Sequence, residues 1–371
     1  MYLEKASVES IYNTIVKMQV RRDQVVLIAL AHKNRPDIQS LIKRLNNAQI
    51  SFMGGVFPGV IDRSASYDEG ALVWILPCES SPFLVRDLSI TGLQLPWAEV
   101  TGHFSTKYTA MIFVDGLSSN IGKYLDTLYN QLGNSVNYVG GGAGGADLKQ
   151  QPCVFTSEGV FQDAAVVALI KQESHLGMCH GWKRMFGPIV TTRTEANRIV
   201  ELNWENAFAV YKYVIEKYAG KKINTDNFSE IANDYPLGFI KENAESVVRD
   251  AREVNSAGEL TCYGEVPENT VVDILTCDKQ SFLEAAKQVA ACCNENAKGK
   301  VAKQAIIIEC VARKQFLKED FTLELAAVRE SISENTGTDL VEGMLSLGEI
   351  ASGQGFLHYF NKTIVTAVFY E

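Results

Sequence analysis

The feature that most constrains the fold is a unit that recurs three times along the chain. Each copy begins with an apolar run and continues through a polar turn into an amphipathic helix. It then returns as a second strand with glycine near its end, and closes with another apolar strand. The opening runs are Val25–Leu30, Ala110–Val114 and Ala305–Cys310. This order predicts a mixed α/β (α+β) fold made of βαβ-type units with added hairpins.

Apolar spacing places the other elements of each copy. Residues recurring every three or four positions predict helices at 38–45, 121–132 and 321–332. Pro36 is expected to be the first residue of the first helix, because its missing N–H costs nothing there. The closing strands are expected at Ala71–Leu76, Ala164–Ile170 and Thr363–Tyr370.

A segment with a different residue pattern separates the second and third copies. Ile189–Glu195 and Arg198–Leu202 alternate apolar and polar residues, which predicts a hairpin. Aromatic and aliphatic residues recur every three or four positions across 204–218, which predicts an amphipathic helix. The polar stretch 221–227 is a candidate linker. Ser281 and Glu284 form a capping-box sequence that is expected to open a later helix.

Composition excludes several classes of function. The chain has 371 residues and a net charge of −9 without a basic run, which argues against nucleic acid and anionic membrane surfaces as partners. No apolar run approaches a membrane span, and the first 20 residues do not read as a signal peptide. Eight cysteines without a CxxC pair argue against zinc and disulfides. We therefore expect a cytoplasmic protein.

Gly140–Gly145 matches the GxGxxG pattern and follows a predicted strand. A dinucleotide site needs a helix directly after these glycines, whereas the next recognisable element here is a strand. One interpretation is a tight exit from the strand, that is, a sharp turn at its end that requires positive φ. Another is that bare backbone, at Gly141 and Gly142, approaches a small ligand.

Opposite charges follow two strands of the third copy. Cys310 ends a strand and Arg313 comes three residues later, while Glu349 follows Gly348. An arginine at a strand end can hold a carboxylate through two parallel hydrogen bonds, and a glutamate can hold an amine. This pairing suits an amino acid or a similar zwitterion, and the alternative is an ion pair between Arg313 and Glu349 themselves.

Several segments, taken in order, resemble the FIST family of sensory domains over nearly the whole chain. No single segment identifies the family, but the order of the segments along the chain is specific to it. The matching segments are Tyr138–Gly145, His180–Trp182, Val190–Thr191, Asn197, Glu201–Leu202, Ala207, Tyr211, Pro236–Leu237, Val248–Arg249, Cys310–Arg313, Ser346–Ile350 and Phe360–Thr363.

The resemblance implies an N-terminal FIST domain, placed at 1–220, and a C-terminal FIST domain, placed at 221–371. It implies sensing of a small ligand, with amino acids proposed for the family, and signalling through a separate protein such as a histidine kinase or cyclase. Some relatives are said to bind haem and respond to nitric oxide. No catalytic residues can be carried over, so we expect a non-enzymatic sensor without a cofactor.

The resulting hypothesis places a ligand at the strand ends of the third copy. Arg313 is expected to bind its carboxylate and Glu349 its amine, with neutral hydrogen bonds from Asn361 and Thr363. The remaining candidates, which shape the wall, are Cys310, Ser346, Gly348, Gly141 and Gly142.

Three alternatives stay open. The first is a haem sensor with His180 or His358 as the iron ligand. The second is a hydrolase that uses Cys310, although no histidine lies near it in sequence. The third, compatible with ligand sensing, is an interaction module that presents the 204–218 face to a signalling partner.

Overall fold

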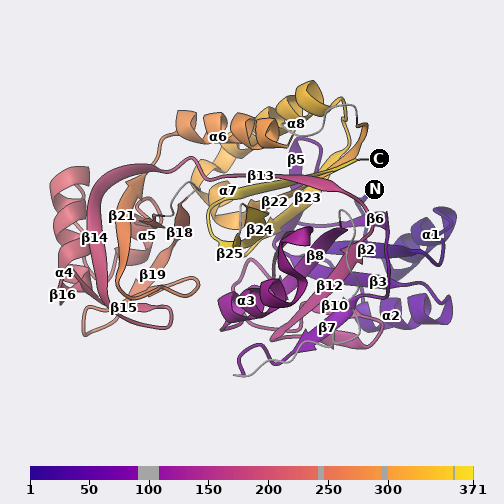
Figure 1. Cartoon of the computed structure of the whole chain (residues 1–371), viewed down its shortest axis with the longest axis horizontal. Coiled ribbons are helices and arrows are strands. Elements are labelled where there is room, and N and C mark those ends of the chain that lie inside the picture. Colours follow the sequence, from indigo (N-terminus) through magenta and orange to yellow (C-terminus); the bar gives the residue numbers. More distant parts are fainter. Residues whose placement is uncertain (91–107, 241–245, 294–299, 354–355, 371) are drawn as a thin grey trace.

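The computed structural model describes residues 1–90, 108–240, 246–293, 300–353 and 356–370. These residues form a larger part, which we call the body (1–182 and 279–370), and a smaller part, the module (183–278), at the left of Figure 1. The predicted fold class is confirmed, because helices and mixed sheets alternate through the chain.

The body consists of the three units expected from the sequence. The first contains β1 (Tyr2–Leu3), α1 (Val8–Lys17), β2 (Gln24–Ala31), α2 (Ile38–Asn47), β3 (Phe52–Phe57), β4 (Gly59–Asp62), β5 (Ala65–Tyr67) and β6 (Ala71–Pro77). The second contains β7 (Phe83–Arg86), β8 (Tyr108–Asp115), α3 (Ile121–Leu132), η1 (Gly133–Ser135), β9 (Val136–Ala143), β10 (Val154–Thr156), β11 (Gly159–Phe161) and β12 (Ala164–Ile170).

The third unit follows the same plan. It contains β13 (Ser174–Cys179), α6 (Lys279–Cys292), β22 (Ala302–Cys310), α7 (Val311–Leu317), η3 (Lys318–Asp320), α8 (Phe321–Thr336), β23 (Val341–Ser346), β24 (Glu349–Gly353), β25 (Phe356–Phe360) and β26 (Ile364–Tyr370). Helices α6 and α8 pack against each other at the top of Figure 1.

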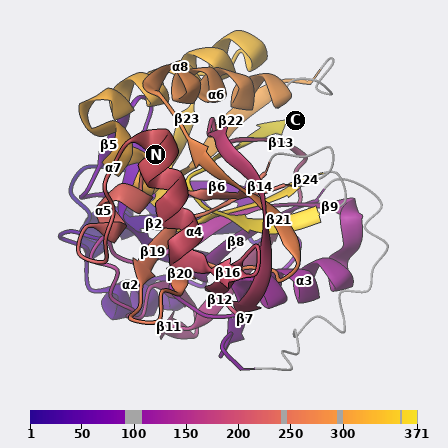
Figure 2. The same ribbon diagram turned by 90° about the vertical axis from the view of Figure 1, so that its left-hand side faces the viewer.

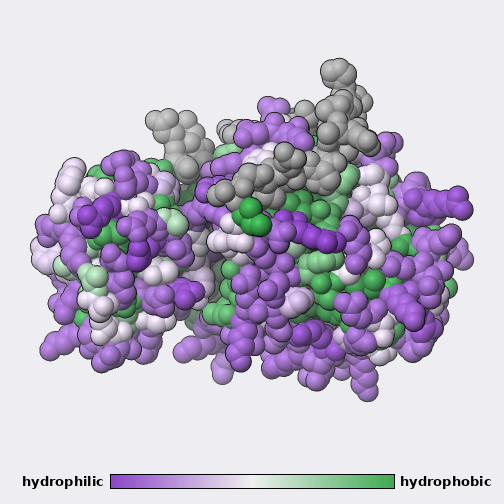
Figure 3. Space-filling view, turned by 90° about the horizontal axis from the view of Figure 1, so that it is seen from below, coloured by the Kyte–Doolittle hydropathy of each residue, from purple (hydrophilic) through white to green (hydrophobic). Residues whose placement is uncertain are grey.

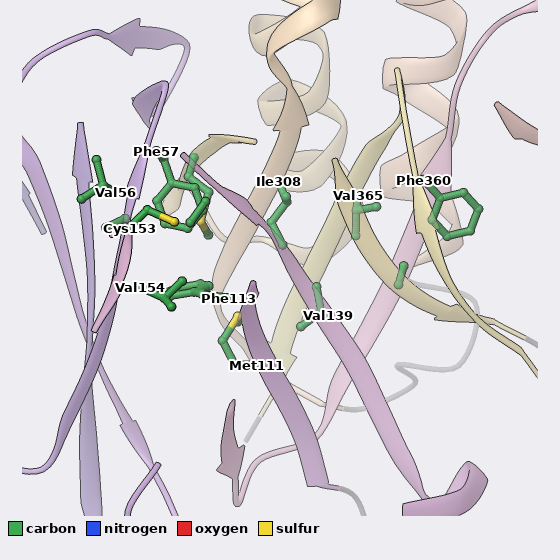
Figure 4. Close-up of a cluster of buried hydrophobic side chains, with 14 of the residues drawn as sticks. Val56, Phe57, Met111, Phe113, Val139, Cys153, Val154, Ile308, Phe360 and Val365 are labelled. Atoms are coloured by element: carbon green, nitrogen blue, oxygen red, sulfur yellow. The ribbon is translucent and has the colours of Figure 1, made fainter. Parts of the chain in front are cut away.

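The hairpin of each unit pairs with a strand of another unit, so that the three units are linked in cyclic order. In each unit the first strand is parallel to the strand after the helix, and antiparallel to the closing strand. The hairpin between them leaves its own sheet: β4 pairs with β23, β10 with β3, and β24 with β9. Three six-stranded sheets therefore share strands cyclically. Their buried side chains meet in one core, where residues of all three units pack together (Figure 4).

A shared glycine explains part of the repeat. Gly54, Gly140 and Gly343 hold equivalent positions on the second parallel strands. A Cβ atom there would lie 2.8, 1.8 and 1.9 Å from a carbonyl oxygen of the neighbouring parallel strand. Side chains larger than hydrogen are thus excluded by close backbone approach. Gly140–Gly142 lie within β9, and of the glycines in 140–145 positive φ is found at Gly144 (φ 145°), so the tight-exit interpretation holds only there.

The module is inserted between β13 and α6 and forms one sheet with two helical segments on it (Figure 2). The strand order is β18-β17-β21-β14-β15-β20-β19, with β16 on β15. Its elements are β14 (Lys183–Glu195), β15 (Arg198–Leu202), β16 (Glu205–Asn206), α4 (Ala207–Val214), the π-helix η2 (Ile215–Ala219), α5 (Phe228–Ala232), β17 (Leu237–Phe239), β18 (Val247–Arg249), β19 (Ala251–Val254), β20 (Leu260–Cys262) and β21 (Thr270–Thr276).

Capping residues shift three predicted helix starts. The first helix begins at Ile38, because Asp37 accepts a hydrogen bond from the N–H of Gln39 and leaves Pro36 outside. Asp278, not Ser281, caps α6 and accepts from Ser281 N at 2.7 Å. In both of these helices an aspartate carboxylate takes the capping role.

The predicted helix at 204–218 also begins later than expected. Asn206 caps α4 by accepting from Ala209 N at 3.2 Å, so Trp204 lies in the turn before the helix and is 77% exposed. The stretch 221–227 joins η2 to α5 inside the module. Strands from both sides of position 220 share sheets, and the domain boundary placed there stays a prediction.

Candidate functional site

Four of the segments that carried the family resemblance, those with His180, Arg249, Arg313 and Lys362, meet where the module joins the body. The turn between β25 and β26, residues 361–363, lies at the centre of this junction. Arg249 of the module donates to the carbonyl of Tyr359 at 2.9 Å, and His180 Nε2 lies 2.8 Å from Ser246 Oγ. Polar contacts between segments that are distant in sequence therefore cross the junction, beside a hydrophobic cluster that the module and the body share.

Lys362 extends from this turn into the module. Its side chain is 1% exposed, and its ammonium donates to the Oδ1 and backbone oxygens of Asn233 at 2.7 and 3.0 Å. The same ammonium pairs with Asp250 Oδ2 at 3.1 Å. Among the ion pairs within the described ranges, this one joins the body to the module. A buried ammonium with three acceptors uses all three of its protons.

A cavity of about 630 Å³ opens beside this contact, between α5 and β19 of the module and α7 of the body. In the view from below, an indentation separates the module on the left from the body on the right, and hydrophilic residues dominate both surfaces (Figure 3). The cavity lining combines acidic, basic, neutral polar and apolar residues: Glu230, Asp234, Asp250; Arg252, Lys318; Ser229, Asn233, Tyr263, Gln315; Leu148, Ala251 and Phe316.

Among the lining residues, Asp250 has a buried side-chain oxygen, Oδ1, that lacks a hydrogen-bond partner among the described residues. The residue as a whole is 8% exposed. Burial raises the pKa of its carboxyl, and Lys362 offsets only part of that rise. A buried acceptor without a donor is costly, so a ligand N–H or O–H placed there would recover free energy.

Arg313 is placed differently from the sequence hypothesis. Its guanidinium is completely buried, pairs with Glu309 at 2.8 Å and with Glu324, and donates to the carbonyls of His180 and Lys362. It also lies 4.1 Å from the centre of the Phe282 ring. Burial alone lowers its pKa, but Glu324 and Glu309 raise it above the usual value. The two terminal guanidinium nitrogens therefore already donate hydrogen bonds inside the protein, and Nε pairs with Glu309 by charge. Glu349 is not among the ion-pair partners of Arg313 within the described residues.

Glu349 is brought close to three of the other predicted residues. Its carboxyl accepts from the Ser346 hydroxyl at 2.6 Å and from Thr363 N at 3.2 Å, and the Cys310 side chain lies beside it. Burial raises its pKa to about 8, although these donors work in the opposite direction. The carboxyl is therefore poised to hold a proton at neutral pH.

Cys310 sits in the same cluster as a buried thiol. Burial and the nearby Glu349 carboxyl raise its pKa well above the usual thiol value. A nucleophilic cysteine needs a lowered pKa and a basic partner. This environment therefore offers no support for a hydrolase that uses Cys310.

The predicted glycines pack against protein rather than an open space. A Cβ atom on Gly348 or Gly142 would lie 2.3 or 2.6 Å from atoms of the Tyr359 side chain, and one on Gly141 would meet Ile308 and Ser346. Gly142 N donates to Gly348 O at 2.7 Å. The space beside these glycines is thus filled by the Tyr359 side chain and by the paired strands.

Asn361 and Thr363 flank Lys362 in the turn. The Thr363 hydroxyl donates to the carbonyl of Asn361 at 2.9 Å. Asn361 Oδ1 is buried without a hydrogen-bond partner among the described residues, although Asn361 is not part of the cavity lining. These two residues therefore fix the turn that presents Lys362.

The two candidate haem ligands lie apart from the cavity lining. His180 accepts from Trp182 N at 2.8 Å through Nδ1 and contacts Ser246 through Nε2, so both ring nitrogens are engaged. His358 stacks on Phe356 with ring centres 5.1 Å apart, on strand β25 at the edge of its sheet. A polar cavity with three carboxylates does not fit a haem, whose macrocycle needs an apolar slot and an axial ligand.

Neither a metal centre nor a membrane span is found in the part of the chain that the structure describes. No three histidine, cysteine or acidic side chains there come together as a metal site. No helix among those residues is long and apolar enough to cross a membrane.

Sequence reasoning missed the residues that line the cavity. Lys362 lay inside the quoted segment Phe360–Thr363, and Asp250 directly follows the segment Val248–Arg249. Neither segment indicates by itself that the two side chains meet, because about 110 positions separate them. The convergence of matched segments was the available signal, and only the fold shows it.

The comparisons with known proteins now identify the family. The model of the FIST N domain matches residues 24–205, and that of the FIST C domain matches residues 207–352. The chain belongs to the FIST family. FIST domains are small-ligand sensory domains of signal transduction. Both matches end or begin inside the module, so the family motifs span the junction described above.

Other comparisons add little. No curated protein matches the chain. One solved structure, "Structure of PurLQS from Thermotoga maritima", is 10% identical over the whole of this chain, which spans 66% of that chain. Its TM-score is 0.18, and a likeness at that level carries no argument about fold or function.

Proposed function

We propose that this FIST protein senses a small zwitterion, such as an amino acid, in the cavity between the module and the body. The carrying observation is that Asp250, which lines a polar cavity, has a buried Oδ1 atom without a hydrogen-bond donor among the described residues. A ligand donor that reaches this acceptor would satisfy it.

The cavity offers both charges that a zwitterion needs. Asp250 and Glu230 supply carboxylates for an ammonium group, while Arg252 and Lys318 supply cations for a carboxylate. Phe316 and Leu148 leave apolar surface for a side chain. A ligand of one charge alone would leave part of this lining without a partner.

The strand-end residues of the sequence hypothesis form the support behind this cavity. Glu349 and Arg313 fix the 361–363 turn through Thr363 N and the Lys362 carbonyl. In our proposal Glu349 and Arg313 position Lys362, and the lining residues contact the ligand. The response reaches a separate signalling protein, such as a histidine kinase or cyclase, through movement of the module.

A thermal-shift screen of the common amino acids and small carboxylates against the full chain tests the proposal. A ligand at 100 times its Kd stabilises the native state by about 2.7 kcal/mol, which is a shift of several degrees. Asp250→Asn should abolish the shift for amino acids, and Glu253→Gln, an exposed neighbour, should preserve it. A shift that survives in Asp250→Asn would overturn the site.

An absorption spectrum of the same protein with added haemin addresses the haem alternative. Protein-ligated haem absorbs strongly at about 400–430 nm. We expect no sharp stoichiometric band. Such a band, lost in His180→Ala, would replace the amino-acid proposal with a haem sensor.

A further inference from the structure

The contact between Lys362 and the module resembles a bound ligand in its chemistry. An ammonium group reaches from the body into a pocket of acceptors on the module, namely both oxygens of Asn233 and Oδ2 of Asp250. Asn233 and Asp250 also line the cavity. Two residues that hold Lys362 are thus also residues that a ligand ammonium in the cavity can contact.

The two ends of this contact differ in how firmly they are held. On the body side the turn is fixed by Arg313, which donates to the Lys362 carbonyl at 3.0 Å, and by Thr363 N on Glu349 at 3.2 Å. Lys362 itself has φ 54°, a left-handed conformation that such contacts must maintain. The turn therefore moves with the body, and separation would occur between Lys362 and the module.

Two covalent connections join the module to the body. It joins the body through the chain between β13 and β14, and again between β21 and α6. Gly181, with φ 75°, lies at the first of these connections. Other contacts across the junction are hydrogen bonds, such as that from Arg249 to the Tyr359 carbonyl, and a hydrophobic cluster that Val248 and Leu275 of the module share with body residues.

We propose that Lys362 is a built-in competitor of the ligand: a primary ammonium on the ligand takes over Asp250 and Asn233, and the module is released from the body. This rests on the proposed function, and adds the ligand group that is recognised and the way in which binding is transmitted. A second ammonium can use the two Asn233 oxygens and Oδ2 of Asp250 only by displacing Lys362, and the two like charges repel in a buried site.

The first test needs no ligand. Spin labels on the exposed residues Lys123 and Glu216, in a Cys292→Ser background, report the distance between body and module by electron paramagnetic resonance. Lys362→Met fills the same space without a charge, and we expect a broader and longer distance distribution than in the parent. Asp250→Asn, which weakens the contact from the other side, should shift it in the same direction. An unchanged distribution in both variants would overturn the proposal.

The second test distinguishes a Lys362 that competes with the ligand from a Lys362 that only supports the junction. Titration calorimetry with glycine, ethanolamine and acetate compares the parent with Lys362→Met. We expect Lys362→Met to bind the two amines roughly tenfold more tightly or better, because the internal competitor is gone. Acetate, which has no ammonium, should show no such gain. Equal or weaker amine binding in Lys362→Met would overturn the competition.

Matched variants keep the two proposals distinguishable. Lys318→Met removes a lysine that lines the cavity, and should weaken glycine binding without changing the label distances. Asp250→Asn should open the junction as Lys362→Met does, but it should lose amine binding where Lys362→Met gains it, so the binding readout separates the two variants. If neither parent nor variant binds any amine, the proposed function fails, and the distance measurement alone still decides whether Lys362 holds the module.

Discussion

Two buried cations lie at neighbouring places in this protein and have different surroundings. Arg313 is enclosed by Glu309, Glu324, two carbonyls and the face of Phe282. Lys362 is equally buried, but its partner Asp250 faces a cavity and keeps one oxygen without a donor among the described residues. The Arg313 cluster also contains buried atoms without a hydrogen-bond partner in the described ranges, among them Arg313 Nε and Glu324 Oε2, but none of its residues lines the cavity. The comparison teaches that an enclosed charge cluster maintains the fold, whereas an unpartnered atom marks the place for a ligand only where its residue lines a cavity.

The largest effect is expected for Arg313→Met. Removing the guanidinium leaves Glu309 and Glu324 buried without a counter-charge, which costs about 3–5 kcal/mol of unfolding free energy. Urea denaturation followed by circular dichroism measures this loss. A change below about 1 kcal/mol would show that the Arg313 cluster is not structural.

The glycine that the three units share gives the next largest effect. Gly140→Ala places a methyl group 1.8 Å from the Ile112 carbonyl oxygen, so β8 and β9 must separate. We expect a loss of about 3 kcal/mol, in the range of severe overpacking. Gly122→Ala in α3 is the control, because its Cβ meets only the flexible end of Glu265. Equal losses in the two variants would contradict the close-approach explanation.

Glu349 gives a pH-dependent prediction. Its pKa is about 8 in the folded chain, against 4.5 for an unperturbed glutamate, so between these values only the folded state holds the proton. This contribution to stability is therefore full below pH 4.5 and is lost as the pH rises toward 8, by about 1.4 kcal/mol per unit. Glu349→Gln should be relatively more stable than the parent at pH 8 than at pH 5, measured by urea denaturation. A parallel pH profile for both proteins would contradict the assignment.

The smallest effect on stability is expected at the cavity. Asp250→Asn leaves Lys362 with the two oxygens of Asn233 and a neutral amide oxygen, so the expected loss is about 1–2 kcal/mol. Ligand binding should nevertheless disappear in this variant. A loss as large as that of Arg313→Met would place Asp250 with the structural cluster and not with the ligand site.

Much of the fold was predictable because its periodicity is local. The predicted strand Ala164–Ile170 and helix 321–332 are confirmed, since apolar spacing reports directly on the period of each element. The exchange of hairpins between units was not predictable, because strands such as β4 and β23 pair over hundreds of positions. Helix starts were displaced where an aspartate cap, such as Asp278, preceded the residue that the sequence pattern favoured as the cap.

The candidate site was predictable only in part, for a related reason. The sequence indicated that Cys310, Ser346, Glu349 and Thr363 belong near one another, because they follow adjacent strands of one unit. It did not indicate that Glu309 and Glu324 would surround Arg313, since α8 had to be folded over β22 first. The cavity needed the module as well, and no local pattern shows which face of a module meets the body.

The measurement that tests the account most directly is a hydrogen-exchange map of the full chain, recorded with and without the amino acid that gives the largest thermal shift. A ligand in the cavity predicts altered exchange in α5 and at the turn between β18 and β19, around residues 229–234 and 249–252. The same account predicts no local protection at residues 140–145 and 346–349 beyond the global stabilisation. Protection centred on those strand ends, with α5 unchanged, would contradict a ligand site between the module and the body.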